Sequence, residues 1–170
     1  MRSTMPSFSE KRVLPYAPDQ LFDLVAAVDR YPEFLPWCIA SRIRTRESFV
    51  DTDGRARERM EADLVIGFKM IRERFTSKVE LLRPHEVLVT DVTGPFDHLR
   101  NRWTFEPHPE GCLIDFEVDF KFRSRLLDNV MGALFGEATR RMVRAFEARA
   151  ADLYGRPGLQ RGQAPRAAEP

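Results

Sequence analysis

The longest regular pattern of apolar and polar positions runs from Arg125 to Tyr154, near the end of the chain. Apolar residues recur there every three or four positions, which is the spacing of one helix face. Ser124 can serve as the N-cap and Gly155 as the stop, so we expect a helix about 45 Å long. Such a helix cannot bury its apolar stripe alone and needs a broad partner surface.

Strand-like segments upstream offer that partner. The clearest runs from Cys112 to Phe122, where apolar residues occupy every second position and charged residues fill most of the gaps. This period of two is typical of an antiparallel strand with one buried face. Turn-forming residues separate the segments, which favours antiparallel pairing of neighbours. The other predicted strands are residues 8–14, 39–48, 55–66, 69–82, 86–93 and 99–106.

Two short helical segments are expected after the first strand. Residues 19–28 show helical spacing of apolar positions behind Pro18, and residues 29–36 combine aromatic residues with prolines that permit only a short helical turn. The order of elements predicts an α+β fold, in which a curved antiparallel sheet of about seven strands wraps around the long C-terminal helix.

Gly132 and Gly136 lie one turn apart in the predicted long helix and leave little side chain on that side. One interpretation is close packing of the helix against a strand. The other is a gap that helps to form a cavity between the helix and the sheet. The residue pattern leaves both interpretations open.

Length and charge narrow the class of protein. The 170 residues suffice for one domain with a substantial core, which we expect at residues 8–155. We expect residues 1–7 to be flexible and residues 156–170, rich in Pro, Gly, Ala, Gln and Arg, to be a disordered tail. The 27 basic and 26 acidic residues give a net charge of +1, which argues against a general nucleic-acid binder. Candidates for a local basic patch are the arginines of the last helix together with Arg42, Arg44 and Arg46.

The cysteines and the apolar runs favour a cytoplasmic location. Cys38 and Cys112 are too few for a disulfide framework and lack metal-ligand spacing, as expected in a reducing compartment. No apolar run approaches the roughly 20 residues that cross a bilayer, and the N-terminus lacks the apolar core of a signal peptide.

No catalytic motif is present, so we predict no catalytic residues and no metal site. His85, His98 and His108 lie beside prolines or in predicted turns and are interpreted as surface residues. Glu58, Glu73 and Asn101 fall on apolar strand faces, where a carboxylate or amide needs a partner. Either a bulge or strand end turns these side chains to solvent, or they orient a ligand in an apolar cavity.

Aromatic residues indicate the kind of interior. The chain has 13 Phe, 2 Trp and 3 Tyr, mostly on predicted inner faces or in residues 31–37. An aromatic interior is ordinarily a plain core. Here the inner faces of both sheet and helix carry large residues while the helix also has two glycines, and we expect an apolar tunnel that opens at one end.

Several segments carry a family resemblance: Tyr31-Pro32-Glu33-Phe34-Leu35-Pro36-Trp37-Cys38, Gly94-Pro95-Phe96, Trp103-Thr104-Phe105, the Cys112–Phe122 strand and the ending Ala145–Gly155. Together they resemble the ubiquinone-binding START-domain proteins of the respiratory chain. That group includes proteins named as ribosome-association toxins and belongs to the polyketide cyclase/dehydrase-like, helix-grip superfamily. The resemblance implies a helix-grip fold whose cavity holds a polyisoprenoid quinone, with no required cofactor and no known catalysis.

Three functional hypotheses follow. The first is non-enzymatic binding of ubiquinone by a carrier or chaperone that supports respiratory electron transport and quinone synthesis, with weak contact at the inner face of the membrane. Respiratory or quinone-synthesis proteins are its expected partners, and DNA is not. The second is a ribosome-binding regulator that blocks subunit association. The third is a cyclase or hydrolase that uses Glu58 or Glu73 as acid or base.

The predicted site has two parts. Asn101 is expected to hydrogen-bond a quinone carbonyl, Trp103 to contact the lipid and Phe116 to support mainly the fold. The mouth is expected near residues 31–37 and 94–96, although these segments can also act as a plug over the end of the barrel. The predicted cavity residues are Phe34, Leu35, Trp37, Phe68, Phe96, Asn101, Trp103, Phe105, Phe116, Met131, Leu134, Phe135 and Met142. The predicted membrane-facing residues are Arg30, Tyr31, Phe34, Phe96, Arg100 and Arg102.

Overall fold

Seven strands and one long helix make up most of the protein. The structure, a computed structural model, describes residues 7–68 and 70–155. The elements in chain order are β1 (Ser7–Leu14), α1 (Pro18–Ala26), the 3-10 helix η1 (Val28–Glu33), β2 (Cys38–Val50), β3 (Ala56–Phe68), β4 (Ile71–Leu82), β5 (Glu86–Thr93), β6 (Phe96–His108), β7 (Gly111–Phe122) and α2 (Arg125–Tyr154). This order confirms the predicted helix-grip fold.

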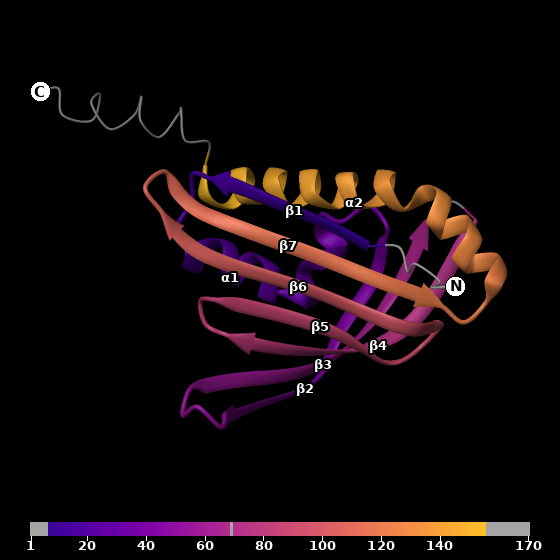
Figure 1. The fold of residues 1–170 in the computed structure, drawn as a ribbon, viewed down its shortest axis with the longest axis horizontal. Coiled ribbons are helices and arrows are strands. Elements are labelled where there is room, and N and C mark those ends of the chain that lie inside the picture. Colours follow the sequence, from indigo (N-terminus) through magenta and orange to yellow (C-terminus); the bar gives the residue numbers. More distant parts are fainter. Residues whose placement is uncertain (1–6, 69, 156–170) are drawn as a thin grey trace, which may run out of the picture.

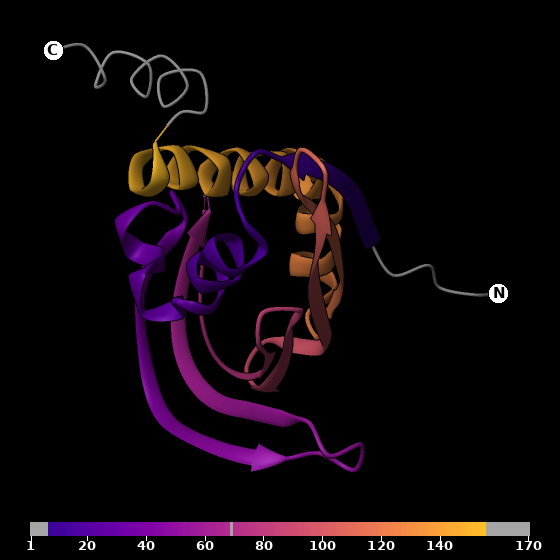
Figure 2. The ribbon, with the colours of Figure 1, turned by 90° about the vertical axis from the view of Figure 1, so that its left-hand side faces the viewer.

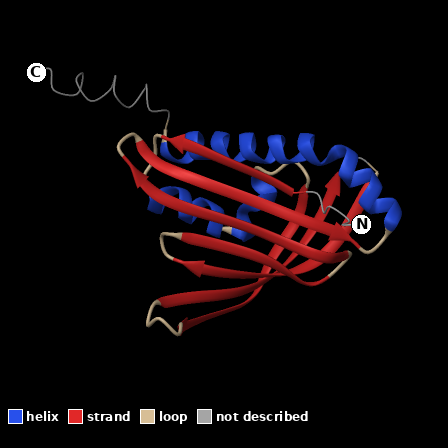
Figure 3. Cartoon of the chain, in the orientation of Figure 1, coloured by secondary structure: helices blue, strands red, loops and turns tan. Residues whose placement is uncertain are grey.

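The strands form one antiparallel sheet in the order β1-β7-β6-β5-β4-β3-β2. The sheet curves, and α2 lies across its concave side (Figures 1 and 2). The helices α1 and η1 lie inside the same curve, so all helices cover one face of the sheet (Figure 3). This layering explains the alternating pattern of the strands, because one face of the sheet meets the helices and the other meets solvent.

The ends of α2 agree with the sequence prediction. Leu127 N donates to Ser124 Oγ at 3.3 Å, and Gly155 ends the helix with a positive φ of 83°. Asp128 accepts a hydrogen bond from Phe122 N at 3.1 Å and so ties the first turn to the end of β7. No helix within residues 7–68 and 70–155 has the length and apolar content that a membrane span requires.

The C-terminal half of α2 is packed more deeply than the half before Thr139, in which Phe135 lies over Phe120 of β7 with ring centroids 4.8 Å apart. The Phe146 ring lies 5.0 Å from that of Trp103, 5.2 Å from Phe34 and 5.5 Å from Tyr31, measured between ring centroids. Polar contacts add to this packing. They join Glu147 to Arg12, Arg149 to Glu33, Tyr154 to the carbonyl of Gln20, and Tyr16 to the carbonyl of Gly155.

The helix α2 bends between its two halves (Figure 1). Thr139 donates its hydroxyl hydrogen bond to the carbonyl oxygens of Phe135, at 2.6 Å, and Gly136, at 3.3 Å. A hydroxyl that bonds back to the preceding turn is a known cause of helix bending. The bend separates the more deeply packed half of α2 from the half that precedes Thr139.

The two helix glycines follow neither predicted interpretation. A Cβ added at Gly132 would meet open space, and one at Gly136 would meet only the guanidinium of Arg140 on the same helix. The rotation of α2 about its axis therefore turns both positions away from the strands. Close packing through these glycines and a gap made by them are both wrong.

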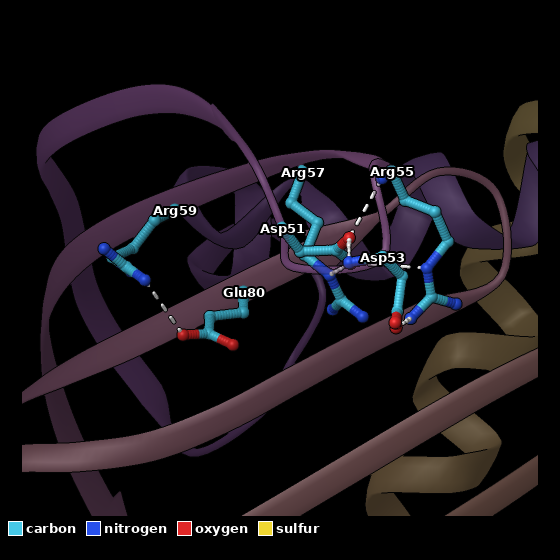
Figure 4. Close-up of polar contacts among 6 residues, drawn as sticks. All are labelled: Asp51, Asp53, Arg55, Arg57, Arg59 and Glu80. Carbon is cyan, nitrogen blue, oxygen red and sulfur yellow. Dashed lines mark hydrogen bonds and ion pairs between the residues drawn. The ribbon is translucent and has the colours of Figure 1, made fainter.

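The tip of the β2–β3 hairpin is held by charged side chains (Figure 4). Asp51 accepts from the backbone nitrogens of Asp53 and Arg55, both at 2.9 Å, and from Arg57 Nε at 2.6 Å. The Arg57 hydrogen bond is the main reason why the pKa of Asp51 is lowered to about 2. This network holds the turn between β2 and β3, which lies at the opposite end of β3 from the β3–β4 turn.

We expect Phe146→Ala to destabilise the fold by about 3–5 kcal/mol, because it removes the ring on which α2 is seated and leaves a cavity. Urea unfolding followed by circular dichroism measures the change. Leu126→Ala is the matched control on the same helix, since Leu126 is 73% exposed and its truncation should change stability by no more than about 0.5 kcal/mol. Equal losses for both variants would contradict the assignment of Phe146 as the seat of α2.

Candidate functional site

An apolar cavity lies between the concave face of the sheet and the helices. It consists of two adjoining chambers that share six lining residues, and together they are called the cavity below. The sheet-side chamber measures about 190 Å³ and is lined by Val28, Tyr31, Leu35, Trp37, Cys38, Leu64, Ile66, Phe75, Ser77, Val79, Val89, Phe96, Leu99, Asn101 and Met142. The helix-side chamber measures about 140 Å³ and is lined by Trp37, Ile66, Phe96, Leu99, Asn101, Val118, Phe120, Phe122, Met131, Phe135, Ala138, Thr139 and Met142.

Strand alternation and the bend of α2 position the walls. Residues of β3 to β7 enter from the sheet at every second position, as the period of two dictates. The helix wall comes from α2 between Met131 and Met142. All of these residues precede Phe146. Met131, Phe135 and Met142 are half-buried, so this part of α2 covers the sheet incompletely.

A glycine at the rim allows two strands to approach closely. Gly94, between β5 and β6, has a φ of 148°, and a Cβ there would collide with the Cβ of Phe75. Any other residue at this position would be strained and would push Phe75 away. Gly94 therefore holds Phe75 and Phe96 together, with ring centroids 5.3 Å apart, in the cavity wall.

Asn101 contributes an unsatisfied polar group to the cavity. Its Oδ1 atom is buried and has no hydrogen-bond partner among the described residues. The hydroxyls of Ser77 and Thr139 in the walls are satisfied. Ser77 donates to the Ala62 carbonyl at 3.4 Å, and Thr139 donates to the Phe135 carbonyl. A buried polar atom without a partner costs on the order of 1–3 kcal/mol, so Asn101 is suited to pairing with a ligand. Its amide can accept through Oδ1 or, after a flip, donate through Nδ2.

Seven predicted cavity residues line the cavity together: Leu35, Trp37, Phe96, Asn101, Met131, Phe135 and Met142. They come from the segment after η1, from β6 and from α2, so the structure gathers three distant parts of the chain at one place. Phe68 cannot be compared, because its side chain lies outside the described residues.

Five predicted cavity residues belong elsewhere. Trp103 is 4% exposed and packs against Phe116 at 4.5 Å, and Phe105 packs against Phe22 at 5.9 Å, so all three predicted strand residues are core. Trp103 and Phe116 line neither chamber and border a separate space of about 30 Å³, which is far smaller than either chamber. Two further corrections concern Phe34, which packs against Phe146, and Leu134, which is half-buried but lines neither chamber.

Sequence reasoning also missed lining residues. Most of them, such as Ile66, Phe75 and Phe120, lie an even number of positions from other inward-facing residues of the same strand. The alternation of apolar and polar residues therefore contained the signal. Tyr31 and Cys38 had no such signal. Tyr31 lines the cavity and donates to the Val25 carbonyl, and burial raises the pKa of its phenol.

The two strand glutamates do not provide a buried acid or base. Glu58 is partly exposed near the end of its strand and accepts from Arg83 Nε at 3.0 Å, as the strand-end interpretation predicts. Glu73 is half-buried and pairs with Ile66 across the β3–β4 ladder. Neither residue lines either chamber, which removes the acid or base of the cyclase hypothesis.

The predicted membrane-facing residues do not form one surface. Phe96 is only 5% exposed, while Tyr31 and Phe34 pack against Phe146, so the aromatic groups of both predicted lips face inward. This arrangement matches the plug interpretation. The three arginines are engaged in ion pairs, which are Arg30 with Glu33, Arg100 with Glu117 and Arg102 with Glu86.

The fold and the cavity together define a helix-grip protein with an internal apolar site. The family model "Polyketide cyclase / dehydrase and lipid transport" matches residues 14–147, and the chain belongs to this family. A relative from Rickettsia prowazekii, "Ribosome association toxin RatA", is 36% identical over 153 residues, which cover 88% of this chain and 99% of that protein.

A second relative and a solved structure are also similar to this chain. The Xenopus laevis protein "Coenzyme Q-binding protein COQ10 homolog B, mitochondrial" is 34% identical over 154 residues, covering 88% of this chain and 59% of that protein. The solution structure of an 18 kDa protein from Caulobacter crescentus is 35% identical, has a TM-score of 0.70, and the match covers 89% of this chain and 100% of that one. The Rickettsia prowazekii and Xenopus laevis relatives are thus named for ribosome association and for coenzyme Q binding, whereas the family model also names cyclases and dehydrases.

The Cys38 thiol in the cavity wall predicts a pH dependence of stability. Burial raises its pKa to about 11, whereas an unfolded cysteine titrates near about 8.5. The stabilisation from the protonated thiol is therefore fully present below about pH 8.5 and is lost as the pH rises through about 11. We expect a loss of stability from this group, measured by urea unfolding across that range. Cys38→Ala should show a shallower alkaline decline, and an unchanged decline would refute the assignment.

Proposed function

We propose that this protein binds ubiquinone, or a related isoprenoid quinone, without catalysing a reaction. The observation that carries the proposal is the buried Oδ1 atom of Asn101, which has no partner among the described residues and lies in a largely apolar cavity. A quinone ring has carbonyl acceptors that the Asn101 Nδ2 hydrogens can reach after an amide flip. The surrounding aliphatic and aromatic walls suit the ring substituents and the first part of the isoprenoid chain, at about 0.8 kcal/mol for each buried methylene.

The size of the cavity limits what it can enclose. Each chamber is comparable with the engineered cavity of about 150 Å³ that accepts benzene. The two chambers thus suit a ring and a short length of chain. A long polyisoprenoid tail would extend beyond the cavity, which fits a carrier or chaperone that meets its ligand at a membrane surface.

The cellular role is part of the proposal. A chain similar to a coenzyme Q-binding protein, with a cavity suited to a ring, is proposed to support respiratory electron transport and quinone synthesis. Its partners would then include respiratory or quinone-synthesis proteins, and its place would be the inner face of the membrane.

Lipid extraction tests the proposal. Protein from a quinone-producing host is extracted with organic solvent, and mass spectrometry should detect quinone at near-stoichiometric amounts. Ala138→Leu should lose most of it, because Ala138 lines the helix-side chamber and a larger side chain fills that space. Ala133→Leu is the matched control, since Ala133 is exposed on the same helix and should retain the quinone.

Asn101→Leu provides a second test. It should lower quinone retention about tenfold or more, the equivalent of one lost hydrogen bond, while the empty protein becomes no less stable. Absence of quinone from the parent protein, or equal retention by Ala138→Leu and Ala133→Leu, would overturn the proposal.

Ribosome binding is the second candidate function. The observation in its favour is a pair of exposed arginines, Arg140 and Arg144, one turn apart on α2 and outside the cavity lining. The relative named as a ribosome association toxin matches nearly its whole length. The strand arginines support it less, because Arg42 and Arg44 both lie near Asp63, at 3.7 Å and 3.6 Å.

Sedimentation of ribosomes decides this candidate. Added protein should shift assembled ribosomes toward free subunits. Replacing both Arg140 and Arg144 by Glu should abolish this shift without loss of extracted quinone. An unchanged sedimentation profile at equimolar protein removes the ribosome from consideration.

A further inference from the structure

Exposed apolar side chains gather at the end of the sheet where the cavity walls are incompletely buried. Met70, in the β3–β4 turn, is 98% exposed, and Leu126, in the first turn of α2, is 73% exposed. Ile39 in β2 and Val130 in α2 are also exposed apolar residues. Single exposed apolar residues are common, but several of them at one end of a protein can mark an interaction surface.

The strand register places these elements at one end of the protein, called the mouth end below. Cys38 at the start of β2 pairs with Ile66, and Phe68 pairs with Ile71 across the β3–β4 turn. The β3–β4 turn, the start of β6 and the end of β7 therefore lie at the same end of the antiparallel sheet, and α2 begins there (Figure 1). The half-buried cavity residues Trp37 and Met131 belong to the same end.

Arginines occur near the exposed apolar groups in sequence. Arg72, Arg74, Arg123 and Arg125 are all exposed and follow the β3–β4 turn or flank the start of α2. Of these, Arg123 has a carboxylate within ion-pair distance among the described residues, Asp97 at 3.8 Å. The nearby Asp128 is engaged with Phe122 N. The mouth end thus combines apolar tips with three arginines, Arg72, Arg74 and Arg125, for which the described residues provide no ion pair, although the carboxylates of Glu73, Asp97 and Asp128 belong to the same elements.

We propose that the mouth end docks on an anionic lipid bilayer, with Met70 and Leu126 inserted at the level of the headgroups and the arginines at the phosphates. Apolar side chains with basic neighbours are the combination that binds such a surface. The inference deepens the proposed quinone function and rests on it for its purpose, because a cavity too small for a whole polyisoprenoid needs its opening in lipid. The docking surface itself is testable without quinone.

The opposite end of the sheet offers an internal control. Val50 and Leu153 are also exposed, at 69% and 50%. Val50 adjoins the hairpin tip, where Asp51 and Asp53 pair with the local arginines (Figure 4). This end has exposed apolar groups, but the arginines of its hairpin tip, Arg55 and Arg57, are paired with Asp51 and Asp53, so we expect it to bind lipid less well than the mouth end.

Vesicle co-sedimentation measures the docking. The full chain should bind vesicles of equal parts phosphatidylcholine and phosphatidylglycerol at least about tenfold more tightly than phosphatidylcholine alone, and binding should fall as salt rises. The double variant Met70→Ser, Leu126→Ser should bind at least about tenfold more weakly, since two apolar side chains no longer enter the lipid. The control double variant Val50→Ser, Leu153→Ser should bind like the parent. Arg72→Gln with Arg125→Gln should reduce the preference for phosphatidylglycerol.

Two results would overturn the docking surface. One is equal vesicle binding by the two serine double variants, provided both melt cooperatively. The other is a parent protein that does not bind vesicles but forms a dimer, which is lost in the Met70→Ser, Leu126→Ser variant. A second copy of the chain would then cover the exposed apolar residues. A parent that binds vesicles through the mouth end but yields no quinone on extraction would overturn the proposed function and leave the docking surface standing.

Discussion

The Phe146 ring joins α2 to the rest of the protein, and the other features of the interior depend on where it is seated. It contacts rings from η1, from the segment after it and from β6, so one side chain fixes the helix against three parts of the chain. The contacts of Glu147 and Arg149 hold the same half of α2 at its flanks. Burial of a large aromatic side chain contributes more than these partly exposed ion pairs do.

The cavity lies beneath the part of the 30-residue helix α2 that is packed less deeply, where Phe135 still contacts Phe120 of β7. Beyond the bend at Thr139, α2 carries Met131, Phe135 and Ala138 over the sheet without burying them fully. The aromatic core around Trp103 and Phe116 fills the other half of the interior. The protein therefore has a closely packed half and a half with free volume, and the buried Oδ1 atom of Asn101, which has no partner among the described residues, lies in the second.

The two names borne by similar proteins correspond to different surfaces of this molecule. Quinone binding would concern the inside of the sheet, where α2 contributes its apolar stripe. Ribosome association would concern arginines such as Arg140 and Arg144 on the same helix but outside that lining. One long amphipathic helix can thus present a ligand site and a charged outer face independently. The two functions do not exclude each other on physical grounds.

Local pattern was enough to predict the elements, because hydrogen bonding and side-chain direction repeat along a helix or strand. The limits of α2 at Arg125 and Tyr154 followed from Ser124, Gly155 and the apolar period, and the seven strands from alternation and turn residues. The inner face of β6 was likewise identified. That part of the fold depends on interactions between residues close in sequence or adjacent in the sheet.

Tertiary structure alone decided which inner residues line the cavity. Asn101 and Trp103 share one strand and one face, yet Asn101 lines the cavity while Trp103 is core, because Phe146 reaches Trp103 from a residue far along the chain. The helix glycines and the apolar tips at Met70 and Leu126 depend in the same way on how α2 rotates and where it begins relative to the sheet. Periodicity states which face of an element is apolar, but the place at which two faces meet is set by long-range packing that no local pattern contains.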